Sequence, residues 1–495
     1  MKKIFLAIII FICIDGVAQQ KPRTIITTDG EIDDVDSYIR MLLYSNEFNV
    51  EGLVYSSSMW HYKGDGKGTK FVSEMAMTKQ IYGEKTDLRW PGTTWMNGLI
   101  DAYEKVYPNL IKHAKGYPTA NYLRSVVKVG NIDFEGEMQK NTEGSAFIKT
   151  KLLDKTTASI YLQVWGGTNT IARALKSIEE EYKNTPQWNS IYKKVCSKAI
   201  LFTILDQDAT YKKYIAVQWK DIKVYYNSTQ FWCLAYNWKK AVPEKLHYCL
   251  EAKFMGEQII NNHGSLTKMY YSYGDGQKQE GDNEHIHGDP TKLKNAQWGS
   301  FNIYDFISEG DSPAFLHLIN VGLDNLQDPE YGGWGGRLIK SKETPSRWED
   351  GSAAADYNPY TDTMDLAYAQ TRWIETLQND FAARANWCVA DFKHANHPPL
   401  ISVNKKLITA KSGQKVLINA TAADPDNNSV KINFWQYKEV GTGKETVTIK
   451  QNNNQAEIIL PATLKKGDTV HIIVEGKDSG SPALTRYQRV IITII

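Results

Sequence analysis

The alternation of short apolar segments with helical patterns across residues 22–397 limits the fold more than any other feature of the sequence. Strands that alternate with helices predict βαβ units and a mainly parallel sheet flanked by helices. In the first unit, residues 23–28 and 50–56 have the apolar character of buried strands, and 33–43 repeat apolar residues at helical spacing. We therefore expect an α/β fold with an open sheet.

A second unit begins with the apolar segment 159–164 and continues through Trp165-Gly166-Gly167-Thr168-Asn169 into a helical pattern from residue 171. In open parallel sheets, ligands bind in the crevice at the carboxyl ends of the strands. The turns after residues 28 and 164 are therefore the expected location of a functional site.

The composition changes at His397-Pro398-Pro399, where the two prolines predict an extended linker. After it, strand-like segments without helical periodicity are separated by turn clusters. Such a series predicts an immunoglobulin-like β-sandwich. We expect an α/β domain over 22–397 and a sandwich over 398–495, with Trp435 as the core aromatic. The five expected strands are 415–420, 430–436, 456–460, 470–475 and 486–495.

The N-terminus has the pattern of a signal peptide. Lys2 and Lys3 precede an apolar segment at 4–14, and the small residues Gly16-Val17-Ala18 suit cleavage before Gln19. The apolar segment is too short to span a bilayer. We expect residues 1–18 to be removed and the mature protein to be secreted or periplasmic, without a membrane span.

The charge of the chain excludes few partners by itself. With 58 basic and 56 acidic residues the formal net charge is +2, which predicts neither a nucleic acid nor an anionic membrane as partner. The 14 Trp and 28 Tyr indicate large cores or surfaces on which sugar rings stack.

Two features each allow two interpretations. The turn 424–427 could bind a structural Ca²⁺ or be an Asx-type turn alone. The cysteines that follow the signal could form one or two disulfides or remain buried free thiols, which a chain of this length favours at least equally. They are Cys196, Cys233, Cys249 and Cys388.

A dense acidic cluster follows the first strand. A helix N-terminus stabilises one or two acidic groups through its exposed amides and dipole, but five acids in eight residues repel one another. Hard divalent cations with oxygen ligands relieve that repulsion, and Ca²⁺ accepts six to eight ligands at irregular angles. The cluster therefore predicts a Ca²⁺ site. Its members are Asp29, Glu31, Asp33, Asp34 and Asp36.

Three segments carry a family resemblance. Residues 27–34, Thr-Thr-Asp-Gly-Glu-Ile-Asp-Asp, resemble the N-terminal fingerprint of nucleoside hydrolases, Asp-Thr-Asp-Pro-Gly-x-Asp-Asp. Residues 165–172 resemble the later strand-to-helix turn of these enzymes, and 309–316 resemble the site of their last metal-ligating aspartate.

The resemblance implies a mechanism as well as a fold. It implies that Asp29, besides binding the metal, activates a metal-bound water. It implies that Asp33 contacts a sugar hydroxyl and that Glu31 and Asp36 are bystanders. Asn169, in the second turn, is a further expected substrate contact. The implied Ca²⁺ ligands are Asp29, Asp34, the Trp165 carbonyl and Asp311.

The sequence resembles one branch of nucleoside-hydrolase-like proteins more closely than it resembles true nucleoside hydrolases. Residues 310–316 and 329–337, followed by a tail ending in 484–490, resemble the bacterial nucleoside-hydrolase-like family described as cellulose-binding. This resemblance covers nearly the whole mature chain. It implies a nucleoside hydrolase-like α/β domain with an immunoglobulin-like domain after it, and a sugar or polysaccharide fragment as ligand.

The sequence departs from true nucleoside hydrolases in the residues that select a nucleoside. Gly310 stands where many purine-active members place a histidine that protonates the leaving base, and 52–60 lacks an expected asparagine. Thr27 replaces the first aspartate of the fingerprint. No single proton donor is predicted; the candidates are Glu143, Asp208, Glu309 and His317.

For two loops the sequence allows more than one role. The glycine-rich segment 331–337 either lines the mouth of a carbohydrate site, with Trp334 and Arg337 as substrate contacts, or packs as a tight turn on the α/β core. His285 and His287 could be a metal-ligand pair, but the absence of a third and fourth ligand favours solvated loop residues.

Two functions follow from these observations. The first is a secreted Ca²⁺-dependent hydrolase of the nucleoside hydrolase-like type that cleaves an N- or O-glycosidic bond with metal-activated water. The alternative is a non-catalytic cellulose- or carbohydrate-binding protein on the same scaffold. Nucleoside hydrolases are commonly oligomeric, so a homo-oligomer is compatible with either function, although the added tail could cover that surface.

Overall fold

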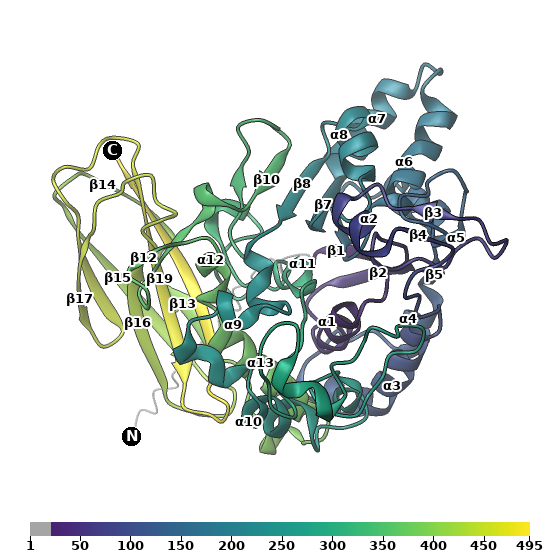
Figure 1. Cartoon of the computed structure of the whole chain (residues 1–495). Helices are drawn as coiled ribbons and strands as arrows, with labels where there is room; N and C mark the ends of the chain where they lie inside the picture. The colour runs from purple at the N-terminus through teal and green to yellow at the C-terminus, as the bar shows by residue number, and fades with distance from the viewer. Residues whose placement is uncertain (1–20) are drawn as a thin grey trace, which may run out of the picture.

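The computed structural model describes residues 21–495 and contains a mixed α/β part and an all-β part (Figure 1). The central sheet has eight strands in the order β5-β2-β1-β6-β7-β8-β10-β9. Every neighbouring pair is parallel except β9 and β10. The expected α/β fold is confirmed. The strands are β1 (Arg23–Thr28), β2 (Asn49–Tyr55), β5 (Val127–Val129), β6 (Ile160–Val164), β7 (Ala199–Ile204), β8 (Lys223–Asn227), β9 (Ile339–Lys340) and β10 (Arg347–Glu349).

Helices cover both faces of this sheet. All six residues of β1 are buried, and successive side chains of a strand point to opposite faces, so Ile25 and Ile26 belong to different cores. The core that includes Ile26 is built with α1 (Ile32–Leu43), α3 (Trp95–His113) and α13 (Ile374–Trp387). The core that includes Ile25 is built with α5 (Glu143–Leu153), α6 (Asn169–Tyr182) and α7 (Trp188–Lys198).

Between β8 and β9 the chain departs from the expected alternation. It forms short helices and loops instead of further βα units before β9 and β10 complete the sheet beyond β8. Gln279 of this segment donates to the Gly30 carbonyl, so the segment lies over the turn after β1. The part at residues 270–302 is called the covering loop below. The short helices of the chain are α2 (Ala76–Tyr82), α4 (Ala120–Ser125), α8 (Ala216–Gln218), α9 (Trp238–Ala241), α10 (Ala252–Met255), α11 (Ser312–Leu316) and α12 (Tyr368–Thr371).

The all-β part consists of two four-stranded sheets, β13-β15-β18-β17 and β14-β20-β19-β16. The expected sandwich is confirmed, and the structure adds three strands, β13, β14 and β17, that the sequence pattern did not predict. The strands are β13 (Leu400–Val403), β14 (Leu407–Ala410), β15 (Lys415–Ala423), β16 (Val430–Gln436), β17 (Thr448–Asn452), β18 (Gln455–Ile459), β19 (Thr469–Asp478) and β20 (Thr485–Ile494). Two small hairpins complete the chain: β3 (Phe71–Val72) with β4 (Glu84–Lys85), and β11 (Asp356–Asn358) with β12 (Thr363–Asp365).

The prediction that Trp435 is the core aromatic of the sandwich is wrong. Phe434, which is 5% exposed, lies in the sandwich core. Because adjacent residues of a strand face opposite ways, Trp435 points out of the sandwich and its ring lies 6.1 Å from that of Trp373 in the α/β part. An error of one residue in a strand reverses the face on which a side chain lies.

The two parts are joined by buried polar contacts. Arg489, in β20, is fully buried, and it donates to the carbonyl oxygens of Leu323 (2.7 Å) and Tyr331 (2.8 Å) in the α/β part. The Tyr437 hydroxyl donates to Asp356 at 2.6 Å, and Arg337 pairs with the same carboxylate. Burial lowers the pKa of Arg489 to about 10.

We expect Arg489→Met to lower the free energy of unfolding by roughly 2 to 4 kcal/mol, because two buried carbonyl groups lose their donors. Thermal unfolding measures the loss. Arg124→Met is the matched control: Arg124 pairs with Asp101 and Glu104 at the surface, and its loss should cost less than about 1 kcal/mol. Equal effects of the two substitutions would contradict the prediction.

The four described cysteines are free and buried, so the free-thiol interpretation is confirmed for them. No helix within residues 21–495 has the length and apolar character that a bilayer crossing requires. The expected signal peptide at 1–18 lies outside the described residues.

Candidate functional site

The carboxyl edge of the sheet brings the predicted acids together. Asp29 follows β1 directly, Asp33 and Asp34 lie in the first turn of α1, and Asp311 immediately precedes α11. Asp33, Asp34 and Asp311 each offer one carboxylate oxygen, and these oxygens all lie within 4.8 Å of one another. We call these three residues the acid cluster. Asp311 is thus brought from a distant part of the chain to the first turn of α1.

The acid cluster carries unbalanced negative charge. Burial, together with the neighbouring carboxylates, raises the pKa of all three members well above the ordinary aspartate range. Asp34 and Asp311 are 1% and 2% exposed, and the hydroxyl of Thr28 donates to Asp34. Three carboxylates so placed need either protons or a cation, and a hard divalent cation suits an all-oxygen donor set.

Asp29 lies beside the acid cluster but is not one of the three residues whose ligand atoms converge. It is 1% exposed, and its Oδ2 is buried with no hydrogen-bond partner. Burial alone would raise the pKa of Asp29, but the nearby His61, whose Nδ1 lies 3.6 Å from Oδ2, outweighs burial and lowers it. Asp29 therefore remains ionised, as a metal ligand or a general base requires.

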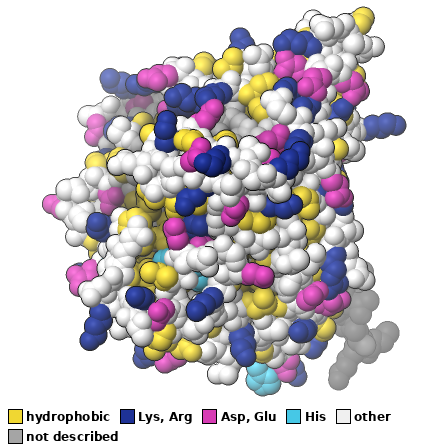
Figure 2. Space-filling view, turned by 45° about the vertical axis from the view of Figure 1, so that its right-hand side comes forward, with side chains coloured by type: hydrophobic (Ala, Val, Ile, Leu, Met, Phe, Trp, Pro, Cys, Tyr) yellow, Lys and Arg dark blue, Asp and Glu magenta, His cyan; other side chains and the backbone are white. Residues whose placement is uncertain are grey.

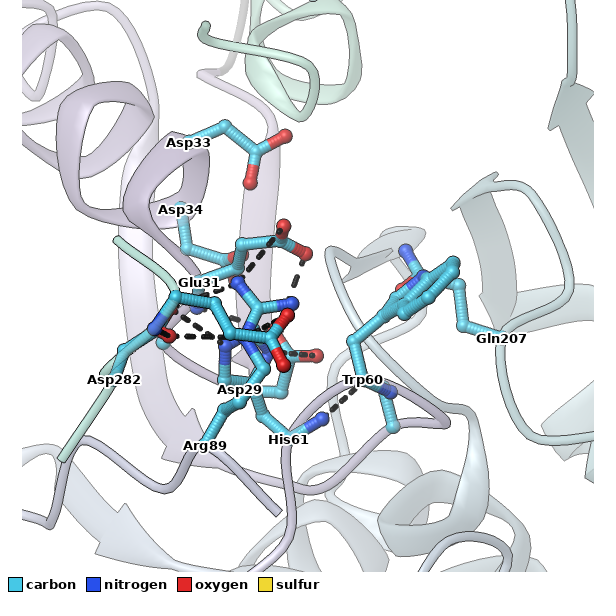
Figure 3. A network of polar contacts seen from close by, with 12 residues as sticks. Asp29, Glu31, Asp33, Asp34, Trp60, His61, Arg89, Gln207 and Asp282 are labelled. Atoms are coloured by element: carbon cyan, nitrogen blue, oxygen red, sulfur yellow. Dashed lines mark hydrogen bonds and ion pairs between the residues drawn. The ribbon is translucent and has the colours of Figure 1, made fainter. Parts of the chain in front are cut away.

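His61 links Asp29 to the covering loop (Figure 3). Its Nε2 lies 3.5 Å from the Oδ2 of Asp282, and Arg89 holds the same carboxylate through two hydrogen bonds of 2.9 and 2.8 Å. Burial would lower the pKa of His61, but Asp282 and Asp29 raise it to about 9. The imidazolium is therefore held between two carboxylates, and it fixes the position of Asp29.

The covering loop closes over the acidic turn. Gln279 donates to the Gly30 carbonyl at 2.5 Å, and Tyr236, below the loop, donates its hydroxyl to Glu31 at 3.0 Å. The rings of His287 and Trp298 stack on Tyr236 at 5.6 and 6.4 Å. Glu31, expected to be a bystander, therefore anchors an aromatic wall beside the acid cluster.

Asp36, the other expected bystander, has a structural role. Its Oδ1 accepts a hydrogen bond of 2.8 Å from the Tyr271 amide, which holds the start of the covering loop against α1. Asp36 is fully buried, and burial raises its pKa well above the ordinary range.

Two glycines permit the close approach of the acids. A Cβ at Gly166 would lie 2.9 Å from both Cβ and Cγ of Asp29, and a Cβ at Gly310 would lie 2.7 Å from Oδ2 of Asp33. Larger residues at these positions would displace the carboxylates. The steric contact at Gly310 also explains why the histidine of purine-active nucleoside hydrolases has no room here without movement of Asp33.

The turn after β6 supports the site mainly through internal contacts. The Trp165 carbonyl accepts a hydrogen bond of 3.0 Å from Gln207, which leaves one lone pair of that oxygen for a ligand. Asn169 is fully buried, and its amide donates to Ser57 (2.8 Å) and to the Asn131 carbonyl (2.9 Å). Asn169 therefore holds neighbouring loops together, and its expected contact with a substrate stays a prediction.

The glycine-rich loop 331–337 packs as a tight turn, which was one of its two interpretations. Arg337 is 2% exposed and is bound to Asp356, and Trp334 is 1% exposed with Arg486 5.7 Å from its ring. Both side chains are used in the contact between the α/β part and the sandwich. The structure therefore favours the tight-turn interpretation of this loop, and the substrate contact expected of Trp334 and Arg337 stays a prediction.

The four candidate proton donors lie in different surroundings, and the choice among them stays a prediction. Glu143 is 63% exposed and pairs with Lys128, and Asp208 accepts a hydrogen bond from the first amide of α6. Glu309 is fully buried against Arg40, and burial lowers the pKa of His317 to about 4.

Two weaker sequence motifs are also explained. His285 and His287 are not solvated as expected: His285 is 5% exposed, and burial lowers the pKa of both rings to about 4. Asp424 accepts hydrogen bonds from the amides of Asp426 and Asn428, which is the Asx-type turn.

Sequence reasoning missed His61, Arg89, Asp282 and Gln279. His61 lies just beyond the end of β2, so the rule that ligands gather at carboxyl ends of strands could have identified it. The other three are brought in by loops whose course no local pattern reveals.

We expect Ca²⁺ binding to strengthen as the pH rises from about 5 to about 8, because the cation must displace protons from acids whose pKa is raised. Isothermal titration calorimetry in buffers with different ionisation enthalpies measures the protons released. A pH-independent affinity without proton release would contradict the expectation.

The face of the molecule shown in Figure 2 carries no dominant sign of charge. On the face in Figure 2, Lys and Arg side chains are interspersed with Asp and Glu. This distribution agrees with the formal net charge of +2 and suits an uncharged ligand such as a sugar.

A solved structure resembles this chain over most of its length. A nucleoside hydrolase-related hypothetical protein from Saccharophagus degradans, described as associated with carbohydrate metabolism, is 24% identical, with a TM-score of 0.70 over 96% of this chain and 100% of that chain. A plant nucleoside hydrolase is 10% identical over 74% of this chain and 99% of that chain, with a TM-score of 0.32. A search of curated proteins gave no match.

Family models match both parts of the chain. Residues 23–338 match "Cellulose-binding Sde182, nucleoside hydrolase-like domain", and residues 415–494 match "Cellulose-binding protein Sde0182, C-terminal domain". The first match covers more than half of the chain and includes every member of the acid cluster. The chain therefore belongs to the family of cellulose-binding proteins with a nucleoside hydrolase-like domain.

Proposed function

We propose that the protein is an exported, Ca²⁺-dependent hydrolase that cleaves an N- or O-glycosidic bond of a sugar or polysaccharide-derived substrate. The observation that carries this proposal is the convergence of Asp33, Asp34 and Asp311 beside an ionised Asp29 whose Oδ2 makes no hydrogen bond. The raised pKa of each cluster member supports a cation as the missing counter-charge.

The donor set fits a hard divalent cation. Asp33, Asp34 and Asp311 would hold it, and the Trp165 carbonyl has a free lone pair to add. When bound, the cation would orient a water molecule and lower the pKa of that water. This ligand set places Asp33 where the family resemblance implied Asp29.

The residues of the chain then have separate roles. Asp29 accepts the proton of the attacking water at Oδ2, and His61, backed by Asp282, keeps Asp29 in position and ionised. Asp33, the least buried member of the acid cluster, also reaches a sugar hydroxyl. The covering loop excludes bulk water. Direct attack by water predicts inversion at the anomeric carbon.

The test is turnover of a substrate panel with Ca²⁺ or with chelator. The panel contains nucleosides, aryl furanosides and pyranosides, and cello-oligosaccharides. We expect chelator to abolish turnover and Asp29→Asn to reduce it by about 10²- to 10⁴-fold. Glu143→Gln, which changes an exposed acid outside the site, should retain the wild-type rate. Turnover that survives both chelator and Asp29→Asn would refute the proposal.

A second function is a carbohydrate-binding protein without turnover. It is supported by the cellulose-binding description of both matched family models and by the glycine in place of the leaving-group histidine. Retention on insoluble cellulose, with Ca²⁺ bound but no turnover of any panel member, would favour it. If neither cellulose nor other insoluble glycans retain the protein, this function is excluded.

A further inference from the structure

A chain of hydrogen bonds crosses the junction of the two domains. His397 Nδ1 lies 2.9 Å from Oδ1 of Asp426, and His397 Nε2 lies 2.9 Å from Nδ1 of His113. This series of hydrogen bonds ends at the Ala390 carbonyl oxygen, which lies 3.0 Å from His113 Nε2. We call these four residues the histidine bridge. They belong to α3, the loop after α13, the interdomain linker and a turn of the sandwich.

The two ends of the histidine bridge fix its number of protons. A carbonyl oxygen such as that of Ala390 only accepts, and so does a carboxylate such as that of Asp426, so His113 Nε2 and His397 Nδ1 must each carry a proton. The contact between the two rings needs one proton more. Two neutral imidazoles carry two protons and two imidazolium ions carry four, whereas the three contacts need three. The pair therefore holds one net positive charge, which Asp426 balances.

The surroundings favour this single charge. His113 and His397 are 9% and 3% exposed, and the His397 ring stacks on Phe392 at 3.9 Å. His113 is the last residue of α3, where the negative end of the helix dipole attracts a cation. Burial lowers the pKa of His113.

Other charges around the histidine bridge are largely compensated. Lys112 and Asp391 lie near His113 with opposite effects on its pKa. A groove of about 230 Å³ beside the rings is also lined by Glu47, Arg384 and Arg486. Arg384 pairs with Glu47, and Arg486 pairs with Asp380. The groove gives water access to the rings without an unpaired charge.

We propose that the histidine bridge is a proton-dependent fastening between the α/β domain and the sandwich, closed when the two rings share three protons. Loss of one of the three protons removes a hydrogen bond from the histidine bridge. Gain of a fourth proton places two positively charged rings against each other. The junction therefore loosens on both sides of an optimum. This inference does not depend on the proposed hydrolase activity.

The direction in which stability changes with pH follows from the number of protons that the folded and unfolded forms bind. The unfolded histidines titrate near pH 6.5. Above that pH the folded protein holds one proton more than the unfolded chain, so the stabilisation is lost as the pH rises. Below it the unfolded chain takes up two protons and the folded pair only one, so stabilisation is lost as the pH falls. The contribution of the pair peaks near pH 6.5.

Neutron diffraction on crystals of the wild-type protein near pD 6.5 counts the ring deuterons directly. Three deuterons on the four ring nitrogens of His113 and His397 are expected, with one between the rings. Two or four deuterons would overturn the proposal. This measurement needs no variant.

A second test compares wild type with the double variant His113→Gln/His397→Gln by reversible unfolding between about pH 5 and 8. The ratio of their folding equilibrium constants should peak near pH 6.5 and fall by up to about tenfold per pH unit on each side. His394→Gln is the control, because the His394 side chain is 78% exposed and its ring bonds to the neighbouring Asp391. A ratio that changes in one direction across the range, or stays flat, would overturn the proposal.

Discussion

Asp311→Asn is expected to stabilise the cation-free protein by about 1 to 2 kcal/mol while it removes the thermal stabilisation by Ca²⁺. Asp311 is 2% exposed, and burial with the charges of Asp33 and Asp29 raises its pKa. Asparagine keeps the shape of the side chain and removes one of the repelling charges, but it also removes a ligand. Wild type should gain about 2.7 kcal/mol at a Ca²⁺ concentration 100 times Kd.

The pH dependence of the stability of the cation-free protein provides a second check on the role of Asp311. A raised pKa means that the folded cation-free protein binds more protons than the unfolded chain, so its stability falls as the pH rises through the raised values. Asp311→Asn should make that fall shallower. Thermal unfolding with chelator and with Ca²⁺ measures both effects, and Asp101→Asn is the exposed control. Asp311→Asn protein that still responds to Ca²⁺ would refute the assignment of this ligand.

Arg40→Met is expected to cost about 3 to 5 kcal/mol of unfolding free energy, because it leaves a buried carboxylate without its counter-charge. Arg40, in α1, and Glu309 are both fully buried and are joined by two hydrogen bonds of 2.5 and 2.9 Å. Glu309 is two residues before Asp311. The pair therefore connects α1, which carries Asp33 and Asp34, to the segment that carries Asp311. Because Arg40→Met breaks this connection, it should also weaken Ca²⁺ binding.

The double variant Arg40→Met/Glu309→Gln separates charge from packing. With no uncompensated charge left, it should recover much of the stability lost in Arg40→Met. The Tyr270 hydroxyl donates to Oε1 of Glu309 and the Ser312 hydroxyl donates to Oε2, so glutamine retains an oxygen acceptor for only one of them. Urea unfolding compares the three proteins. If the double variant is as unstable as Arg40→Met, lost packing rather than buried charge is the cause.

Local sequence was sufficient to predict the elements that carry the acids. β1 and α1 are neighbours in the chain, and their apolar spacing is unambiguous, so the position of Asp29, Asp33 and Asp34 at the carboxyl edge followed from pattern alone. Asp311 required the family resemblance. Nothing in its own neighbourhood indicates that the irregular segment after β8 returns to the first strand of the sheet.

What the sequence did not predict are contacts that form only in three dimensions. Trp334 and Arg337 have the composition of a sugar-binding loop, yet the sandwich covers that loop, and an aromatic residue at a domain contact has the same sequence appearance as one in a binding cleft. Arg89 and Asp282 were missed for the same reason, whereas His61 lies just beyond the end of β2 and could have been identified from the strand pattern. Their mutual positions depend on how the covering loop crosses the site.

The buried Arg489 contacts have a consequence for how such chains are inherited. A β-sandwich attached through a bare linker can be exchanged between genes, but this one supplies donors to two carbonyl groups of its neighbour. Relatives that lost the sandwich would need a new partner for those carbonyls, and a sandwich grafted onto another enzyme would carry a buried guanidinium to a surface without acceptors. Selection should therefore transmit the two domains as one unit.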